Sequence, residues 1–380
     1  MWDTPGMAFD EELTGRLDGL LRRAVDRGRY VRHGLMGIAT DDGGWQWTAG
    51  HGVLDPEGTS ATPASRYPIA SVTKLYTAVV AMRLVEAGHL GLDDRMVDCL
   101  PDDLTADLHI LDGVDRTGDI TVAHLLSHTS GLPDYYEEAP RGQPSPQARL
   151  LAGEDVPVPF DEVLRIVRDE LSPHFPPQDL TAAKAKARYT DTNYQLLGAI
   201  LERRTGQPLH QVFADHVFVP LGLDSTSSYP HPPTSGASPE PDARVWAKDV
   251  VLQPGGALTH QKADGGIIST LDDQLRFMTS IVSGQVFKDP GTWPRMWTRT
   301  NRVFFPVEYG LGVMRYAPAR WMSPLFPVPP LIGHSGSTAT WLFHCPDLAV
   351  VVAGTFDVAQ PPLPFRFLPR VLRAVASAQK

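Results

Sequence analysis

The sequence predicts an α/β (α+β) fold in which both ends of the chain build one sheet domain and a mainly helical domain is inserted between them. Three observations support this organisation. Strand-like segments occur near both ends, amphipathic helix-like segments fill the middle, and 380 residues is long for a single core. We expect a discontinuous sheet domain, 1–84 with 266–380, and an inserted helical domain, 85–265.

The N-terminal elements are a helix, a hairpin and a second helix. Leucines that recur on one side of Phe9–Gly28 predict an amphipathic helix. Gly34–Thr40 and Trp45–Val53 flank Asp41-Asp42-Gly43-Gly44, which is a strong hairpin signal. The apolar stretch that begins at Ser71 predicts a second helix, which ends at Gly88.

Helices are expected in the middle of the chain and strands towards its C-terminus. Apolar periodicity predicts helices at Thr121–His128, Phe160–Leu171, Asn193–Thr205, Leu209–Val219 and Leu271–Val282. Pro-rich loops separate them at Ala139–Phe160, Ser172–Pro177 and Tyr229–Pro241. The later segments predict strands at Tyr309–Tyr316, Leu331–Gly333, Ala339–Cys345 and Leu348–Phe356, and a closing helix at Phe367–Ala378.

Composition excludes several classes of partner. The net charge of −10 argues against nucleic acid and anionic membrane surfaces, which need basic patches. No apolar run approaches the ~20 residues of a membrane span, and the acidic N-terminal residues are unlike a signal peptide. We expect a cytoplasmic protein, with a removed signal as the alternative. Cys99 and Cys345 form no metal or redox motif, and thiols and a disulfide both stay open.

The first candidate site is Ser71-Val72-Thr73-Lys74 at the start of a predicted helix. Residues three apart face the same way, with Cβ atoms about 5–6 Å apart. Lys74 can therefore act on the Ser71 hydroxyl, which is a poor nucleophile until a base takes its proton. Free N–H groups at a helix start also suit a developing oxyanion. The alternative is that Ser71 is only a helix cap.

The second candidate site is Tyr189-Thr190-Asp191, in a loop that enters a helix. A nearby cation lowers the pKa of a tyrosine, so Tyr189 is a candidate general base or proton shuttle. The alternative is that Tyr189 packs and Asp191 caps the helix.

The third candidate site is Gly333-His334-Ser335-Gly336-Ser337, at the end of a predicted strand. The backbone of such an edge can pair with an extended substrate. The Ser337 N–H is a candidate second oxyanion donor beside that of Ser71. His334 is a candidate to bind or polarise a substrate group, and an ordinary histidine in a turn is the alternative.

The three motifs, in the order Ser–x–x–Lys, Tyr–x–Asn/Asp and His–x–Gly, resemble those of the penicillin-recognising serine hydrolases. The most similar branch contains class C β-lactamases, D-Ala-D-Ala carboxypeptidases, D-aminopeptidases and esterases. The resemblance covers about Gly34–Phe356. Further family-like segments are Thr121–Tyr135, Tyr194–Gly198, Val219–Leu223 and Asp264–Thr270.

The resemblance implies a β-lactamase/transpeptidase-like fold, with an antiparallel sheet flanked by helices, and an acyl-enzyme mechanism. Ser71 is then the nucleophile, Lys74 its base, and Tyr189 the proton shuttle to the leaving group. His334 stands where the family has Lys or His. The Ser71 and Ser337 N–H groups form the oxyanion hole.

The resemblance also places Asp191, Ser335 and Gly336 at the substrate, and two of the family positions depart from the usual pattern. Asp191 stands where the family usually has Asn, and a carboxylate cannot donate to a substrate carbonyl. We expect it to pair with a lysine or with a donor on the substrate, and near Lys74 it would favour the ammonium. A largely neutral His334 attracts a carboxylate less than a lysine does, which argues against a strong β-lactamase.

The expected function is hydrolysis of an ester or an amide of a small molecule or short peptide. The alternative is a catalytically inactive homologue that binds peptides or assembles. No metal or nucleotide motif occurs, so no cofactor is expected, and the oligomeric state is open. Aromatic residues before the third motif form either a wall of the acyl pocket or ordinary packing. They are Trp293, Trp297, Phe304, Phe305, Tyr309, Trp321 and Phe326.

Overall fold

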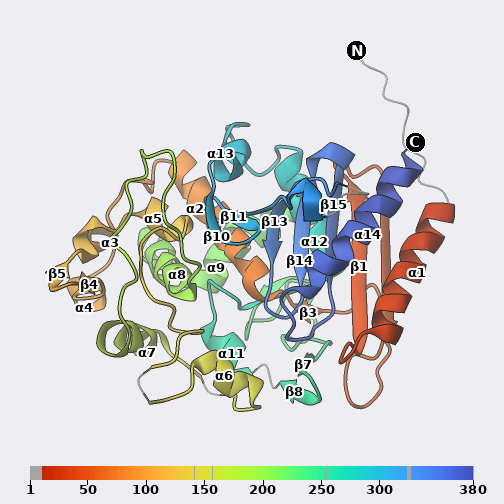
Figure 1. Cartoon of the computed structure of the whole chain (residues 1–380), viewed down its shortest axis with the longest axis horizontal. Coiled ribbons are helices and arrows are strands. Elements are labelled where there is room, and N and C mark those ends of the chain that lie inside the picture. The colour runs from red at the N-terminus through yellow and green to blue at the C-terminus, as the bar shows by residue number, and fades with distance from the viewer. Residues whose placement is uncertain (1–10, 141, 156, 253–254, 323–326, 380) are drawn as a thin grey trace.

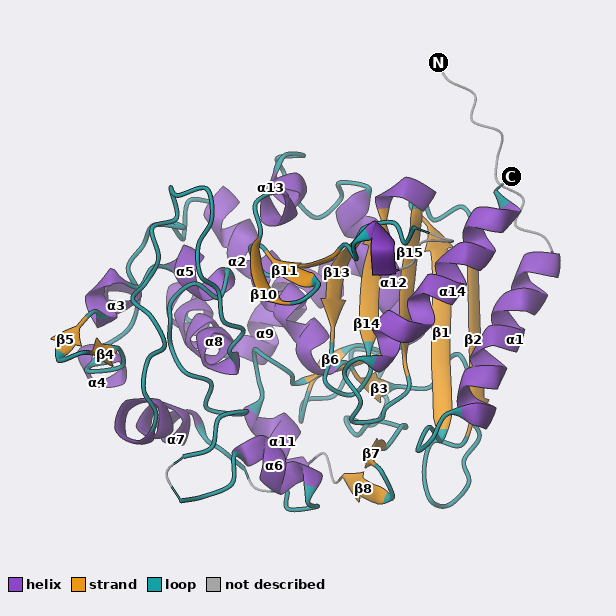
Figure 2. Cartoon of the chain, in the orientation of Figure 1, coloured by secondary structure: helices purple, strands orange, loops and turns teal. Residues whose placement is uncertain are grey.

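The computed structural model describes residues 11–140, 142–155, 157–252, 255–322 and 327–379. Its centre is an eight-stranded sheet in which neighbouring strands are antiparallel (Figures 1 and 2). In spatial order the strands are β10 (Asn301–Phe304), β11 (Val307–Tyr309), β12 (Met314–Tyr316), β13 (Leu331–Ser335), β14 (Trp341–Cys345), β15 (Val350–Thr355), β1 (His33–Thr40) and β2 (Gln46–Gly52).

The two ends of the chain meet in the middle of this sheet. β1 pairs with β15 from Leu35 opposite Thr355 to Thr40 opposite Val350. All residues of both strands are buried, as expected where helices cover both faces of a sheet. This pairing and the antiparallel sheet confirm the expected fold class.

Helices cover both faces of the sheet. α1 (Glu11–Arg27) and α14 (Leu363–Ala378) lie side by side on one face, and their apolar sides share one buried cluster with that face (Figure 1). α2 (Thr73–Glu86) and α12 (Leu271–Val282) contribute to the other cluster. This second cluster also contains Leu197 from the helical part, so the domain boundaries stay a prediction.

The remaining elements are short or lie away from the large sheet. The helices are α3 (Met96–Cys99), α4 (Asp102–Thr105), α5 (Val122–Leu126), α6 (Pro146–Leu151), α7 (Phe160–Arg165), α8 (Asp191–Thr205), α9 (Leu209–Phe213), α10 (Val219–Leu221), α11 (Gly255–His260) and α13 (Thr292–Thr298). The small sheets are β3 (Tyr67–Pro68), β9 (Ile267–Ser269) and β6 (Ser227–Ser228); β4 (Ile110–Leu111) and β5 (Val114–Asp115); and β7 (Val245–Ala247) and β8 (Val250–Leu252).

Some elements differ from the sequence prediction. The single strand predicted at Tyr309–Tyr316 is wrong: it is the end of β11, a turn and β12. Gly312 makes the turn possible with a φ of +79°. α7 and α9 are shorter than predicted because each passes into a wider π-helical turn, at Ile166–Glu170 and Ala214–Phe218.

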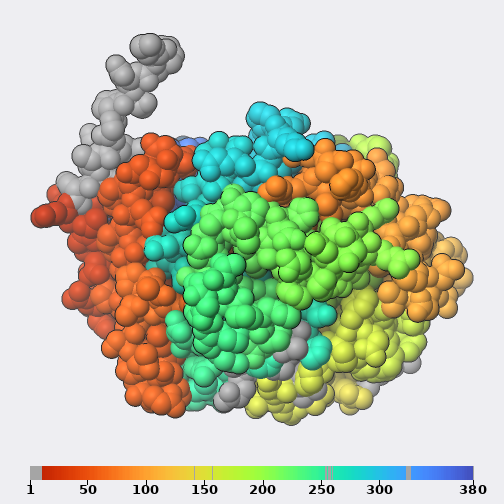
Figure 3. Space-filling view, turned by 180° about the vertical axis from the view of Figure 1, so that it is seen from behind, coloured from red at the N-terminus to blue at the C-terminus, as the bar shows by residue number. Residues whose placement is uncertain are grey.

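Three further features concern the cysteines, the helix lengths and the surface of the molecule. Cys99 and Cys345 are buried free thiols, so a disulfide between them is excluded. Within the described ranges, no helix is both long and apolar enough to cross a membrane. Seen from behind, the middle of the chain covers the centre of the molecule, and the N-terminal strands flank it on one side (Figure 3).

Candidate active site

Ser71 lies in a tight turn between β3 and α2. A 3₁₀ turn, Ala70–Val72, leads directly into α2, so the prediction of a helix that begins near Ser71 is accurate to two residues. Ala70 has a φ of +46°, a conformation that costs a non-glycine residue free energy. Ser71, the next residue, is partly exposed.

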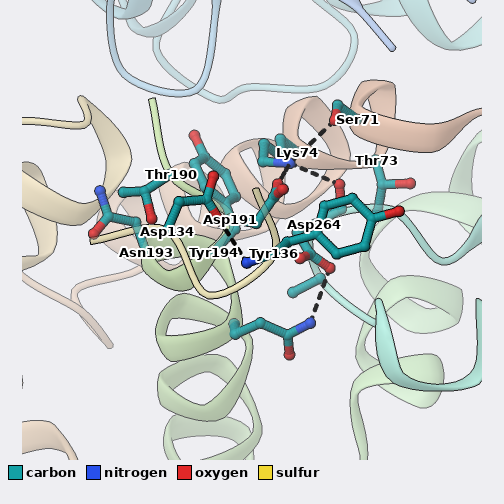
Figure 4. A network of polar contacts seen from close by, with 12 residues as sticks. Ser71, Thr73, Lys74, Asp134, Tyr136, Thr190, Asp191, Asn193, Tyr194 and Asp264 are labelled. Atoms are coloured by element: carbon teal, nitrogen blue, oxygen red, sulfur yellow. Dashed lines mark hydrogen bonds and ion pairs between the residues drawn. The ribbon is translucent and has the colours of Figure 1, made fainter. Parts of the chain in front are cut away.

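Lys74 lies in the first turn of α2 and its side chain is fully buried. Its Nζ donates to Ser71 Oγ at 3.3 Å, to the Asp264 carbonyl oxygen at 2.9 Å and to the Asp191 carboxylate (Figure 4). Three acceptors match the three hydrogens of an ammonium group. The resting site is therefore built around a charged lysine.

The charge on Lys74 follows from its neighbours. Burial lowers the pKa of Lys74, but the Asp191 carboxylate, together with Tyr189 and Asp264, outweighs burial and holds the pKa of Lys74 well above its usual range. Asp191 is the first residue of α8, and the preceding Thr190 caps that helix by accepting from the Thr192 N–H. The expected pairing of Asp191 with a lysine is present, and Asp191 is not the cap.

Tyr189 points towards the same centre. Its ring centroid is 5.0 Å from Lys74 Nζ, and its buried hydroxyl has no hydrogen-bond partner in the described part of the chain. Burial raises the pKa of Tyr189 more than the Lys74 charge lowers it. The expectation of a lowered tyrosine pKa is wrong, and Tyr189 rests as a neutral phenol that can donate a proton.

His334 is fully buried on β13. Its Nδ1 donates to the Ser335 carbonyl at 2.8 Å, and its Nε2 lies 3.0 Å from the Tyr309 hydroxyl, within hydrogen-bond distance. Burial, reinforced by the Lys74 charge, lowers the pKa of His334 to about 3. Both nitrogens are occupied within the protein, so His334 has no free ring nitrogen for a substrate in this structure.

The end of β13 approaches the Ser71 turn closely. A Cβ at Gly336 would lie 2.9 Å from Ala70 Cβ and 3.3 Å from the Ser71 amide nitrogen. The Gly336 N–H donates to Thr340, whereas the Ser337 N–H has no backbone partner among the described residues. The structure thus places Gly336, the neighbour of Ser337, against the Ser71 turn, and the oxyanion hole formed by the Ser71 and Ser337 N–H groups stays a prediction.

A wide cavity of about 630 Å³ opens beside the nucleophile. Candidate site residues that line it are Ser71, Tyr189, Ser335, Gly336 and Ser337. Of the aromatic residues before the third motif, Phe304 and Phe305 also line it, whereas Trp293 and Tyr309 are buried in the core. Trp321 is exposed and stacks on Phe305, and Phe326 lies outside the described residues.

Sequence reasoning did not identify Asp264 as a site residue. Its carboxylate accepts from the Tyr135 hydroxyl at 3.0 Å and from Gln195 Nε2 at 2.9 Å. Burial and the nearby Asp191 charge raise the pKa of Asp264 to about 7. The only sequence signal was its place in the family-like segment Asp264–Thr270.

A second buried carboxyl, Asp134, lies near the same centre (Figure 4). Its pKa is also raised, by burial first and then by Asp191. Within the described residues, no three His, Cys, Asp or Glu side chains gather as a potential metal-binding set.

Comparisons with known proteins found a matching family model and individual relatives. A family model described as "Beta-lactamase" matches residues 17–377. "Penicillin-binding protein 4" of Amycolatopsis lactamdurans is 32% identical over 232 residues, which is 58% of this chain and 51% of that protein. "Esterase EstB" of Burkholderia gladioli is 30% identical over 295 residues, 71% of this chain and 70% of that protein.

Solved structures show the same fold. D-amino acid amidase from Ochrobactrum anthropi SV3, complexed with D-phenylalanine, superposes with a TM-score of 0.75 at 20% identity. The match covers 97% of this chain and 99% of that chain. At this identity the likeness establishes the fold alone. The matched segment spans about half the length of the first curated relative.

Proposed function

Because the chain belongs to the Beta-lactamase family, we propose that it is a serine hydrolase that forms an acyl-enzyme on Ser71 from a carboxylic ester or an amide. The observation that carries this proposal is the 3.3 Å contact between Lys74 Nζ and Ser71 Oγ at the edge of the wide cavity. Penicillin-binding protein, esterase and amidase are the names of its relatives. The substrate is a small molecule or short peptide.

The attack on the carbonyl needs a proton acceptor, which Lys74 and Asp191 supply together. As Ser71 Oγ bonds to the carbonyl carbon, its proton moves to Lys74 Nζ, and Lys74 passes one of its own protons to the Asp191 carboxylate. The carbonyl π electrons move to oxygen, where the Ser71 and Ser337 N–H groups stabilise the charge. Asp191 is therefore the final proton acceptor, because Lys74 is already charged in the resting site.

Tyr189 acts on the leaving group. Its neutral phenol donates a proton to the departing oxygen or nitrogen, and the Lys74 charge stabilises the phenolate that remains. In deacylation a water attacks the acyl carbon and gives its proton to this phenolate. Ser71 Oγ then leaves and regains its proton from the Lys74–Asp191 pair, which closes the cycle.

An ester is favoured over a β-lactam for two reasons. Asp191 has no N–H to donate to an amide carbonyl. His334 is neutral and has both nitrogens occupied, so it offers no cation to the carboxylate of a penicillin. Arg366 also lines the wide cavity, and its positive charge supports a carboxylate-ended peptide as the second candidate substrate. A cytoplasmic location stays a prediction from the sequence.

Turnover of p-nitrophenyl esters, a D-alanyl-D-alanine peptide and a penicillin tests the proposal. Wild-type protein is compared with Ser71→Ala and with Ser283→Ala, a matched control because Ser283 is exposed at the end of α12 and does not line the wide cavity. We expect hydrolysis of the esters that only Ser71→Ala abolishes. No turnover of any substrate by the wild type would favour the inactive homologue, and equal loss in both variants would contradict the role of Ser71.

A further inference from the structure

A second, smaller pocket lies beside the nucleophile. It has a volume of about 210 Å³ and shares Ser337 and Pro361 with the wide cavity. Ala70, which precedes the nucleophile, and Gly265, which follows the residue that binds Lys74, complete its inner end. We call it the apolar pocket.

The outer walls of the apolar pocket are hydrocarbon. Leu150 comes from α6, Val245 and Leu252 from the β7–β8 hairpin, and Leu258 from α11, which gather at one end of the molecule (Figure 2). Val245, Ala247 and Leu252 form a buried cluster separate from the two large cores. This cluster lies at the pocket and not within the main packing of the fold.

The hairpin wall is fixed to the sheet domain. The Trp246 N–H donates to the Asp357 carbonyl at 2.7 Å, and the Ala359 N–H donates to the Trp246 carbonyl at 2.8 Å. The Asp357 carboxylate is in turn bonded to His33 of β1 at 2.9 Å, with both side chains fully buried. A wall anchored in this way gives the pocket a defined size.

The positions of Tyr189 and Ser337 indicate which part of the substrate each of the two cavities receives. Tyr189, the proton donor to the leaving group, lines the wide cavity and is not part of the apolar pocket. Ser337, which holds the oxyanion, lines both. With the oxyanion at Ser337 and the leaving group at Tyr189, the remaining substituent of the carbonyl carbon is directed towards the apolar pocket.

We infer that the apolar pocket binds the acyl side of the substrate and selects an apolar acyl group of about the size of a phenyl ring or a short alkyl chain. This inference rests on the proposed function. A cavity of ~150 Å³ lined by leucine, isoleucine and phenylalanine holds benzene, so 210 Å³ admits a ring with a few further carbons. The wide cavity is left for the leaving group.

The test is a series of p-nitrophenyl esters with acyl chains from acetyl to decanoyl. Each methylene buried in the pocket raises kcat/KM about fourfold, the equivalent of ~0.8 kcal/mol, until the pocket is full. Val245→Phe narrows the pocket and shortens the preferred chain, whereas Val245→Ala widens it and lengthens the preferred chain. Val250→Phe is the matched control, because Val250 lies on the same hairpin and is 41% exposed.

The outcomes separate the inference from the function on which it rests. A preferred chain length that both Val245 variants shift and Val250→Phe leaves in place supports the pocket as the acyl site. A series that neither Val245 variant changes, in an enzyme that turns over every ester through Ser71, overturns the inference and leaves the function standing. If none of the esters reacts, the proposed function itself is overturned. Circular dichroism of each variant identifies a change caused by misfolding, and Val245→Ala provides the test if Val245→Phe does not fold.

Discussion

Lys74 Nζ donates to the Asp191 carboxylate at the base of the Ser71 turn, and this ion pair is almost completely buried. The contact joins the first turn of α2 to the first residue of α8, 117 positions apart. Because of this ion pair Lys74 is charged in the resting site. In the proposed mechanism it can accept the Ser71 proton only if it passes one of its own protons to Asp191.

Replacing Asp191 tests that dependence. We expect Asp191→Asn to lower ester kcat about 10²- to 10⁴-fold at pH 7, the range for loss of a general base. Without the opposing carboxylate, burial lowers the pKa of Lys74, so the remaining activity should rise with pH. The new amide N–H should also raise the rate of penicillin acylation relative to ester hydrolysis.

Asp134→Asn is the control for this variant, since Asp134 is a buried carboxyl near the same centre that the mechanism does not use. Its raised pKa makes asparagine a close match for the neutral acid. Ester kinetics and a pH–rate profile of both variants measure the difference. Unchanged kinetics of Asp191→Asn with every substrate would contradict the relay.

The buried ion pair also predicts a stability effect. Lys74→Met leaves Asp191 without its cation, and breaking a buried pair in this way costs about 3–5 kcal/mol. The double variant Lys74→Met/Asp191→Leu should recover much of that loss, because no uncompensated charge remains. Urea unfolding of the single and double variants gives the coupling. Additive losses would show that the two side chains do not act as a pair.

The raised pKa of Asp264 makes the free energy of unfolding depend on pH. Its pKa is about 7 in the folded protein against 3.8 as an ordinary carboxyl, so the folded state holds a proton that the unfolded state has lost. This contribution to stability is complete below about pH 4 and is lost as the pH rises to about 7. Asp264→Asn should therefore gain stability relative to wild type over that window, as measured by urea unfolding at each pH. A constant difference would exclude a raised pKa.

Gly336 lies close against the Ser71 turn, next to the proposed oxyanion donors. In Gly336→Ala the new methyl group would press on Ala70 and the Ser71 amide. We expect kcat to fall about 10²-fold, as for a displaced oxyanion donor, with a stability loss of about 1–3 kcal/mol.

Gly15→Ala on α1 is the matched control for Gly336→Ala, because nothing lies within 4 Å of its added Cβ. It should leave kcat unchanged and stabilise the protein by up to about 1 kcal/mol. Equal kcat values for the two variants would contradict the close approach.

Sequence patterns predicted what depends on local geometry. The i, i+3 spacing of Ser71 and Lys74 was enough to place one beside the other, because a helical turn fixes that distance. The hairpin β1–β2 followed from its Asp-Gly turn. The split of Tyr309–Tyr316 into two strands was missed, since continuous β propensity conceals a turn made at Gly312.

Properties that depend on burial and on distant partners were not predictable in this way. The raised pKa of Tyr189 depends on desolvation by the folded chain. The occupied His334 ring depends on Tyr309, which belongs to a different strand. Asp264 reaches Lys74 through its backbone carbonyl, which carries no side-chain signature.

The proposed mechanism requires that Ser71 carries the acyl group. The most direct measurement is the intact mass and peptide map of the protein, quenched during p-nitrophenyl ester turnover or after fluorophosphonate treatment. We expect one added acyl or phosphonyl group per chain, on the peptide that contains Ser71, and none in Ser71→Ala. A label on another residue, or an equal label in Ser71→Ala, would contradict it.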